Sequence, residues 1–214
     1  MILYTVTGKA GQAGYLNLKD SGDLTGKNVY VNITNRCPCR CEFCIRNFTD
    51  HLGGTDSLWL DREPTVEEVI ALLQVEDLSP YSEAVFCGYG EPTERLDEML
   101  AIARWIKANT PLRVRVNTNG LSDLINKRDT TEDLRGIIDA VSISLNAKGP
   151  EEYLALCHPR FGIDSFDAII DYTRRVKEVV PDVTMSIVGG TIPRQDERPC
   201  REIAESLGVK FRIR

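Results

Sequence analysis

Short segments typical of β-strands alternate with longer amphipathic segments typical of α-helices from about residue 28 onward. The strand-like segments are 29–34, 84–87, 113–117, 141–145, 183–188 and 209–213, and the helix-like segments begin near residues 65, 92, 131, 165 and 198. Six strands that alternate with five helices predict an α/β fold, in which right-handed βαβ units build a parallel sheet.

The chain has 214 residues, fewer than the roughly 250 of a complete eightfold barrel. We therefore expect a partial, open (β/α)6 TIM-type barrel, with a flat doubly wound sheet as the alternative. Residues 1–27 contain two short apolar patches, at 2–6 and 15–18, which predict a β-hairpin. Our expectation is a single domain over 1–214, with an N-terminal β extension over 1–27 and the partial barrel over 28–214.

Most of the predicted strands alternate apolar and polar residues. Val114 and Val116, for example, alternate with Arg113, Arg115 and Asn117. Buried parallel strands are usually apolar on both faces. The alternation thus predicts that one face packs on helices while the other lines a polar lumen. The alternative is a sheet with one face in water.

The composition excludes several classes of protein. Apolar residues make up 42% of the chain, but none of their runs approaches the ~18 residues of a membrane-spanning helix. The N-terminus does not resemble a signal peptide. A net charge of −6 argues against a dedicated nucleic-acid binder. Seven cysteines without a secretory signal fit a disulfide framework poorly, so we expect a cytoplasmic protein without membrane partners.

Four of the seven cysteines, at positions 37, 39, 41 and 44, lie within eight residues, directly after the first strand of the predicted barrel. Loops at the carboxyl ends of strands are where α/β folds build sites. Cys37, Cys41 and Cys44 can hold three irons of a [4Fe–4S] cluster and leave the fourth iron open. A tetrahedral zinc site and a purely structural cluster are the alternatives.

The CxxxCxxC spacing of Cys37, Cys41 and Cys44, with Phe43 before the last cysteine, resembles the radical SAM superfamily. The resemblance implies that S-adenosylmethionine (SAM) binds the open iron. One electron then cleaves SAM to methionine and a 5′-deoxyadenosyl radical, which abstracts hydrogen from a substrate. It also implies that Phe43 lies near the adenine and that an external reductant such as flavodoxin or ferredoxin supplies the electron.

The turn Cys87-Gly88-Tyr89-Gly90-Glu91-Pro92 follows the second strand of the predicted barrel and resembles the glycine-rich turn of the same superfamily. Tyr89 departs from the pattern, because many members carry a second glycine there. The resemblance implies that Gly88, Gly90 and Glu91 contact the SAM amino group. Glycine permits such a close approach of backbone to ligand.

Three further strand ends agree with this resemblance. It implies SAM contacts at the turn after the third strand, at polar residues of the fourth strand that face the ribose and carboxylate, and at a segment of the fifth strand that lines the adenine. The corresponding residues are Asn117, Asn119, Ser144, Asn146, Val188 and Gly189.

The sequence is most similar to the small radical SAM proteins associated with TatD-family hydrolases, which implies a functional link to such a hydrolase. The substrate is unassigned. The alternatives are an activase that generates a glycyl radical on a partner enzyme and, from a different class, a metal-binding or electron-transfer protein that does not use SAM.

Other polar residues have weaker interpretations. Arg113, Arg115 and Arg212 lie on the polar strand faces, where they either grip a carboxylate or phosphate or form internal ion pairs. Cys39 has the wrong spacing to replace a ligand, and His158 is a weak catalytic candidate. The roles of Cys87, Cys157 and Cys200 stay open, with buried apolar thiols the simplest interpretation.

Overall fold

The computed structural model describes residues 1–7, 14–18, 27–48 and 57–214. The strands are β1 (Leu3–Thr7), β2 (Gly14–Asn17), β3 (Lys27–Val31), β4 (Tyr81–Phe86), β5 (Arg113–Thr118), β6 (Ala140–Ser144), β7 (Asp182–Ile187) and β8 (Lys210–Ile213). The α-helices are α1 (Val66–Val75), α2 (Leu96–Asn109), α3 (Ser122–Asn126), α4 (Pro150–Cys157), α5 (Ser165–Val176) and α6 (Arg194–Ser206). Single 3-10 turns are η2 (Ile45–Asn47), η3 (Pro92–Arg95), η4 (Glu132–Leu134) and η5 (Gly162–Asp164).

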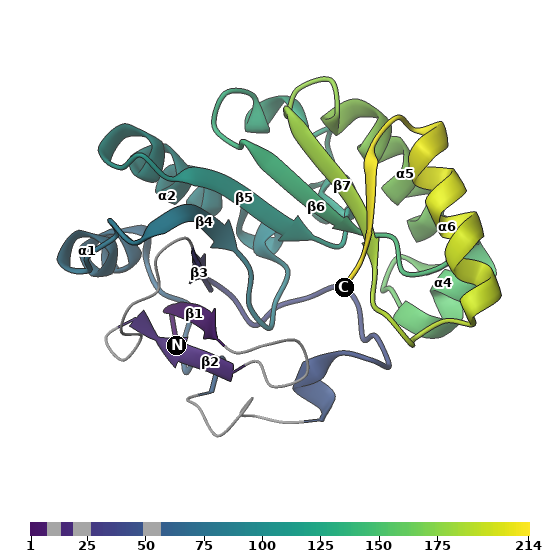
Figure 1. Cartoon of the computed structure of the whole chain (residues 1–214), viewed down its shortest axis with the longest axis horizontal. Coiled ribbons are helices and arrows are strands. Elements are labelled where there is room, and N and C mark those ends of the chain that lie inside the picture. The colour runs from purple at the N-terminus through teal and green to yellow at the C-terminus, as the bar shows by residue number, and fades with distance from the viewer. Residues whose placement is uncertain (8–13, 19–26, 49–56) are drawn as a thin grey trace.

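Within the described ranges, the strands form one sheet in the order β2-β1-β3-β4-β5-β6-β7-β8. Strands β3 to β8 are all parallel, whereas β1 pairs antiparallel with both β2 and β3. Figure 1 shows a twisted, open sheet with the hairpin at one end and β8 at the other. This arrangement confirms the partial, open barrel, and the hairpin over the predicted patches continues its sheet.

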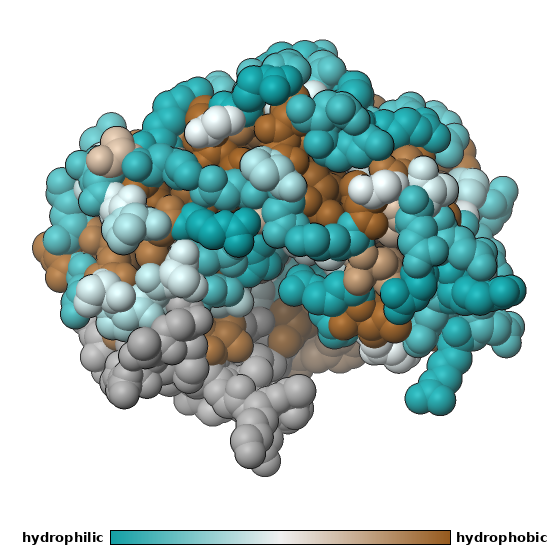
Figure 2. All heavy atoms as spheres, turned by 45° about the horizontal axis from the view of Figure 1, so that its top comes forward, coloured by the Kyte–Doolittle hydropathy of each residue, from teal (hydrophilic) through white to brown (hydrophobic). Residues whose placement is uncertain are grey.

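The two faces of the sheet differ as the alternation predicts. Val114, Val116, Val141 and Ile143 are buried in the core under the helices. Arg115 alternates with those valines and points to the opposite, polar face, where its guanidinium meets Glu83 of β4. On the face seen in Figure 2, hydrophilic residues dominate and apolar side chains form separate patches between them. The polar strand residues Glu83, Arg115, Ser142, Thr184 and Arg212 line one hollow together, so this face of the strands is directed toward the lumen of the open barrel.

The helix expected over 131–138 is wrong, because only the single turn η4 forms there. The backbone N–H and hydroxyl of Thr131 both donate to the Asp129 carboxylate, at 2.9 and 2.7 Å, which favours a turn over a helix. The short helix α3 precedes this turn and ends at Asn126, and the next residue, Lys127, has a φ of +55°. Sequence reasoning also missed α4, which has Pro150 in its first turn, a position that proline tolerates.

In the part of the chain that the structure describes, no helix has both the length and the apolar character that crossing a membrane requires.

Candidate functional site

The cysteine-rich loop runs from the end of β3 to η2 and is fixed on one side by α4. The backbone N–H groups of Arg40 and Glu42 donate to the carbonyls of Cys157 and Leu156, both at 3.0 Å. The N–H of Arg160, just beyond α4, donates to the Pro38 carbonyl at 2.8 Å. The helix that sequence reasoning missed is thus the element that holds the cysteine loop.

The glycine-rich turn after β4 fixes the other side of the loop. The N–H of Glu91 donates to the Arg36 carbonyl at 2.7 Å. The Arg46 guanidinium donates to the carbonyls of Cys39, at 3.0 Å, and Tyr89, at 3.4 Å. A Cβ on Gly90 would lie 2.3 Å from the Thr34 carbonyl oxygen, so only glycine allows this approach. The two predicted motifs therefore pack directly against each other.

The thiols of the loop lie close together at the carboxyl edge of the sheet. Cys37, Cys41 and Cys44 are half-buried and Cys39 is buried. Hydrogen bonding with the neighbouring Cys157 and Cys39 thiols lowers the pKa of Cys41. A hydrogen bond from Cys39 also lowers the pKa of Cys37, while burial raises that of Cys44. Cys39 and Cys157 thus contact the predicted ligands.

The donor set fits an iron–sulfur cluster. Thiolates are the ligands that such clusters use, and charges on Cys41 and Cys37 act on the Cys44 thiol, so the three groups are within electrostatic range of one another. The Asn119 side-chain amide points at the Cys37 sulfur at 3.9 Å, as a donor to a thiolate would. Among the described residues, no three potential ligands are already arranged around one metal position.

Two buried side-chain amide oxygens near the carboxyl ends of β3 and β6 lack hydrogen-bond partners among the described residues. One is Oδ1 of Asn32, and a Cβ on Gly88 would lie only 2.0 Å from it. The other is Oδ1 of Asn146, whose backbone has a φ of +60° and whose amide nitrogen is 3.8 Å from the Cys157 sulfur. Unsatisfied buried acceptors are costly, so these oxygens fit the hydroxyl or amino donors of a bound ligand such as SAM.

The Glu91 carboxylate is buried and already fully engaged. It accepts hydrogen bonds from the N–H and hydroxyl of Thr93, at 3.2 and 2.8 Å, from the Thr118 hydroxyl at 2.8 Å and from the Asn119 N–H at 2.7 Å. Burial raises its pKa, and these four donors partly offset that effect. The side chain thereby joins the ends of β4 and β5.

The remaining residues that the resemblance singles out lie at the carboxyl ends of neighbouring strands. Asn117 and Asn119 end β5, Ser144 and Asn146 end β6, and Val188 and Gly189 follow β7, while Phe43 packs half-buried against the core. Sequence reasoning missed Asn32 and Arg214 and left the role of Cys157 open. Their signal was position alone, since Asn32 directly follows β3, and Arg214, which donates to the Ser144 hydroxyl at 2.8 Å, directly follows β8.

Two of the three candidate arginines form internal ion pairs. Arg115 meets Glu83 at 2.8 Å, and Arg113 lies 3.7 Å from Asp182. Arg212 instead donates to the Ser142 hydroxyl at 3.3 Å. His158 is exposed beside Glu42, at 3.3 Å, on the outer side of the cysteine loop. Cys200 is buried in α6, and Cys87 is half-buried at the end of β4.

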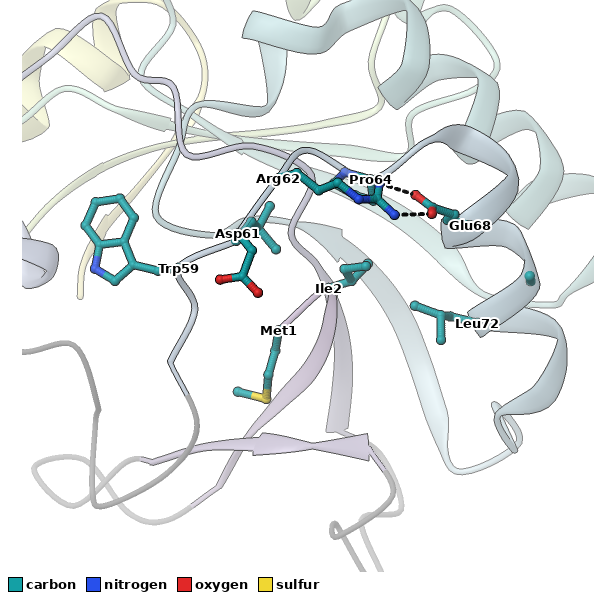
Figure 3. A pocket seen from close by; sticks show the side chains of 10 residues that line it. Met1, Ile2, Trp59, Asp61, Arg62, Pro64, Glu68 and Leu72 are labelled. Atoms are coloured by element: carbon teal, nitrogen blue, oxygen red, sulfur yellow. Dashed lines mark hydrogen bonds and ion pairs between the residues drawn. The ribbon is translucent and has the colours of Figure 1, made fainter.

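Two hollows differ in place and character. The larger, of about 650 Å³, lies outside the lumen between the N-terminus and α1, and Figure 3 shows Met1, Ile2, Trp59 and Leu72 around it. The other, of about 240 Å³, lies inside the lumen and is lined mainly by polar side chains from β4 to β8. Only the lumen hollow adjoins the strands whose ends carry the predicted site.

Comparisons with known proteins agree with this geometry. The family model described as the radical SAM superfamily matches residues 31–206. No curated protein matches the chain.

Several solved structures share the fold. A radical SAM methyltransferase from Sphaerobacter thermophilus superposes with a TM-score of 0.62 at 14% identity, over 100% of this chain and 77% of the other. SuiB from Streptococcus suis, bound to its precursor peptide SuiA, gives 0.65 at 17% identity, over 88% and 39%. The FeFe-hydrogenase maturase HydG from Carboxydothermus hydrogenoformans gives 0.59 at 15% identity, over 84% and 40%. The chain thus spans well under half the length of the last two proteins.

Proposed function

The chain belongs to the radical SAM superfamily, an enzyme superfamily that uses a [4Fe–4S] cluster and SAM, and we propose that Cys37, Cys41 and Cys44 hold the cluster in this member. The observation that carries this proposal is the fixed position of the cysteine loop at the carboxyl edge of the sheet. Hydrogen bonds connect the loop to α4 on one side and to the glycine-rich turn on the other. When bound, the cluster supplies the electron that cleaves SAM to methionine and a 5′-deoxyadenosyl radical, which abstracts hydrogen from a substrate.

The surrounding residues bind and orient SAM in this proposal. The backbone at Gly88, Gly90 and Glu91 faces the SAM amino group, while the Glu91 side chain holds the turn in place. The unpartnered Oδ1 of Asn146 accepts from a ribose hydroxyl, and Ser144 faces the carboxylate. The remaining contacts assigned on the resemblance come from Phe43, Asn117, Asn119, Val188 and Gly189.

The wider setting is also part of the proposal. One domain over 1–214 carries the whole site, and a reductant such as flavodoxin or ferredoxin supplies the electron. The seven cysteines are all free thiols, which supports a reducing compartment such as the cytoplasm. A functional link to a TatD-family hydrolase rests on the sequence resemblance alone.

The test is anaerobic reconstitution with iron and sulfide, followed by addition of SAM and a strong reductant. We expect the wild-type chain to bind about four irons, as a [4Fe–4S] cluster requires, and to release 5′-deoxyadenosine. Cys41→Ala should lose both properties. The matched control is Cys200→Ala, which removes a buried thiol of α6 outside the cysteine loop and should keep both. Uptake of zinc without iron, or undiminished SAM cleavage by Cys41→Ala, would contradict the proposal.

A further inference from the structure

The lumen face of the sheet is positively charged in a chain whose net charge is −6. Along strands β4 to β8 and just after β8, this face carries five cationic side chains and two carboxylates. The cations are Arg113, Arg115, Lys210, Arg212 and Arg214, and the carboxylates are Glu83 and Asp182. A cluster of cationic side chains on one face of an acidic protein attracts negatively charged ligands to that face.

Ion pairing accounts for three of the five cations. Arg115 pairs with Glu83 at 2.8 Å, where both side chains are largely buried. Asp182 lies between Lys210, at 3.0 Å, and Arg113, at 3.7 Å. Arg212 forms no ion pair with any described residue, and its Nη2 donates only to the Ser142 hydroxyl at 3.3 Å. The Arg212 guanidinium thus has unused donors that face the lumen.

The lumen hollow of about 240 Å³ lies beside this guanidinium. Arg212 and the hydroxyl groups of Ser142 on β6 and Thr184 on β7 line it. Arg115, Glu83 and Asp182 line it as well, but Arg115 and Glu83 pair with each other and Asp182 pairs with Lys210 and Arg113. Ser142 and Thr184 are direct partners in the β6–β7 register. A guanidinium and two adjacent hydroxyls are the donors that bind a carboxylate or phosphate group.

This hollow lies deeper in the barrel than Ser144 and Asn146, the residues of β6 assigned to SAM, whereas Asn117 of β5 is level with Ser142. Ser142 and Ser144 are two residues apart on the same face of β6, which separates them by about 7 Å along the strand. Arg214 donates to the hydroxyl of Ser144, nearer the carboxyl end of β6, whereas Arg212 donates to the hydroxyl of Ser142, farther from that end. The hollow thus lies about 7 Å below Ser144 along β6.

We propose that Arg212, with the hydroxyls of Ser142 and Thr184, binds an oxyanion group, carboxylate or phosphate, of a small-molecule substrate below SAM. This inference rests on the proposed function, because it places the substrate of that same site. The volume of the hollow suits a small metabolite or its anionic end and is too small for a folded protein segment.

The test is calorimetric titration of the reconstituted, SAM-saturated chain with inorganic phosphate and, separately, with succinate, each at constant ionic strength. We expect at least one of the two anions to bind, and which one binds identifies the oxyanion. Arg212→Gln should weaken that binding at least about tenfold, because it removes a charge-assisted hydrogen-bond donor. Ser142→Ala should weaken it several-fold, and it keeps the test decisive if Arg212→Gln fails to fold.

The matched control is Arg198→Gln, which removes the same charge from an exposed position of α6 and should leave anion binding within twofold. Three outcomes would overturn the inference: neither anion binds, SAM displaces the anion, or Arg198→Gln weakens binding as much as Arg212→Gln. If the wild-type chain releases 5′-deoxyadenosine but binds neither anion, this inference is contradicted while the proposed function stands. Absence of both cluster and SAM cleavage would instead contradict the proposed function.

Discussion

At the residue scale, one buried carboxylate links the two motifs that the sequence shows most clearly. Glu91 receives four hydrogen bonds from Thr93, Thr118 and Asn119, and its own N–H donates to the Arg36 carbonyl of the cysteine loop. The family resemblance assigns the backbone of this turn, and not this side chain, to the SAM amino group. In the structure, groups of the protein itself engage this side chain.

The same carboxylate should affect how stability depends on pH. Burial raises the pKa of Glu91 above its ordinary 4.5, so the folded chain holds this proton more tightly than the unfolded chain. Its contribution to stability therefore falls as the pH rises from about 4.5 through the raised pKa. Glu91→Gln, which cannot titrate, should be less stable overall but show a flatter profile in this window. Urea unfolding at several pH values measures the slope.

The control for this slope is Glu205→Gln, which removes an exposed carboxyl of α6 and should leave the slope unchanged. A Glu91→Gln profile parallel to that of the wild type would show that Glu91 does not titrate in this window.

Gly90 is a second residue with a sharp steric requirement. A Cβ there would lie 2.3 Å from the Thr34 carbonyl oxygen and 2.6 Å from that of Arg36, and backbone atoms cannot move aside cheaply. Gly90→Ala should therefore push the turn away from the cysteine loop and lower the iron content after reconstitution several-fold. In the control Gly149→Ala, the added Cβ meets only the mobile end of Glu152, so iron content should stay at the wild-type level. Equal iron content in the two variants would contradict this account of Gly90.

At the scale of elements, α4 shows how a short helix escapes sequence reasoning yet supports the site. Eight residues with a weakly segregated apolar face give little periodic signal, and the helix is recognisable only from its packing. Tyr153 and Cys157 of α4 are buried, and the Tyr153 hydroxyl lies 3.8 Å from the Cys39 sulfur. The end of α4 also accepts hydrogen bonds from Arg40 and Glu42 of the cysteine loop.

Helix α1 has the opposite character, because its start is evident from the sequence. The Thr65 hydroxyl accepts from the Glu68 N–H at 3.2 Å, and the Glu68 carboxylate accepts from the Thr65 N–H at 2.8 Å, as a capping box requires. Thr65→Ala should lower the free energy of unfolding by about 1 kcal/mol, whereas Thr65→Ser should keep most of it. Urea denaturation measures both. An equal loss in the two variants would mean that the hydroxyl does not cap the helix.

At the scale of the whole molecule, the open sheet gives the parallel strands two different environments. The outer face packs on helices and is apolar, while the inner face carries Arg115, Asn117, Ser142 and Arg212 toward a lumen that the described strands do not close. The hairpin β1–β2 extends the sheet beyond β3 in antiparallel pairing, which lengthens the wall without adding a further βαβ unit. Apolar and polar residues therefore alternate along the strands because the lumen of the barrel is open and is not packed with apolar side chains.

The sequence by itself determined the alternation of strands and helices, the hairpin and the family, because these depend on periodicity and spacing along the chain. Those signals are local, and the CxxxCxxC spacing at Cys37, Cys41 and Cys44 is specific. Only the tertiary structure decided which polar residues are available to a ligand. Arg113, Arg115 and Arg212 read alike in sequence, but Asp182 and Glu83 pair with the first two from neighbouring strands. Whether a charge is satisfied depends on partners distant in sequence, and only folding brings those partners together.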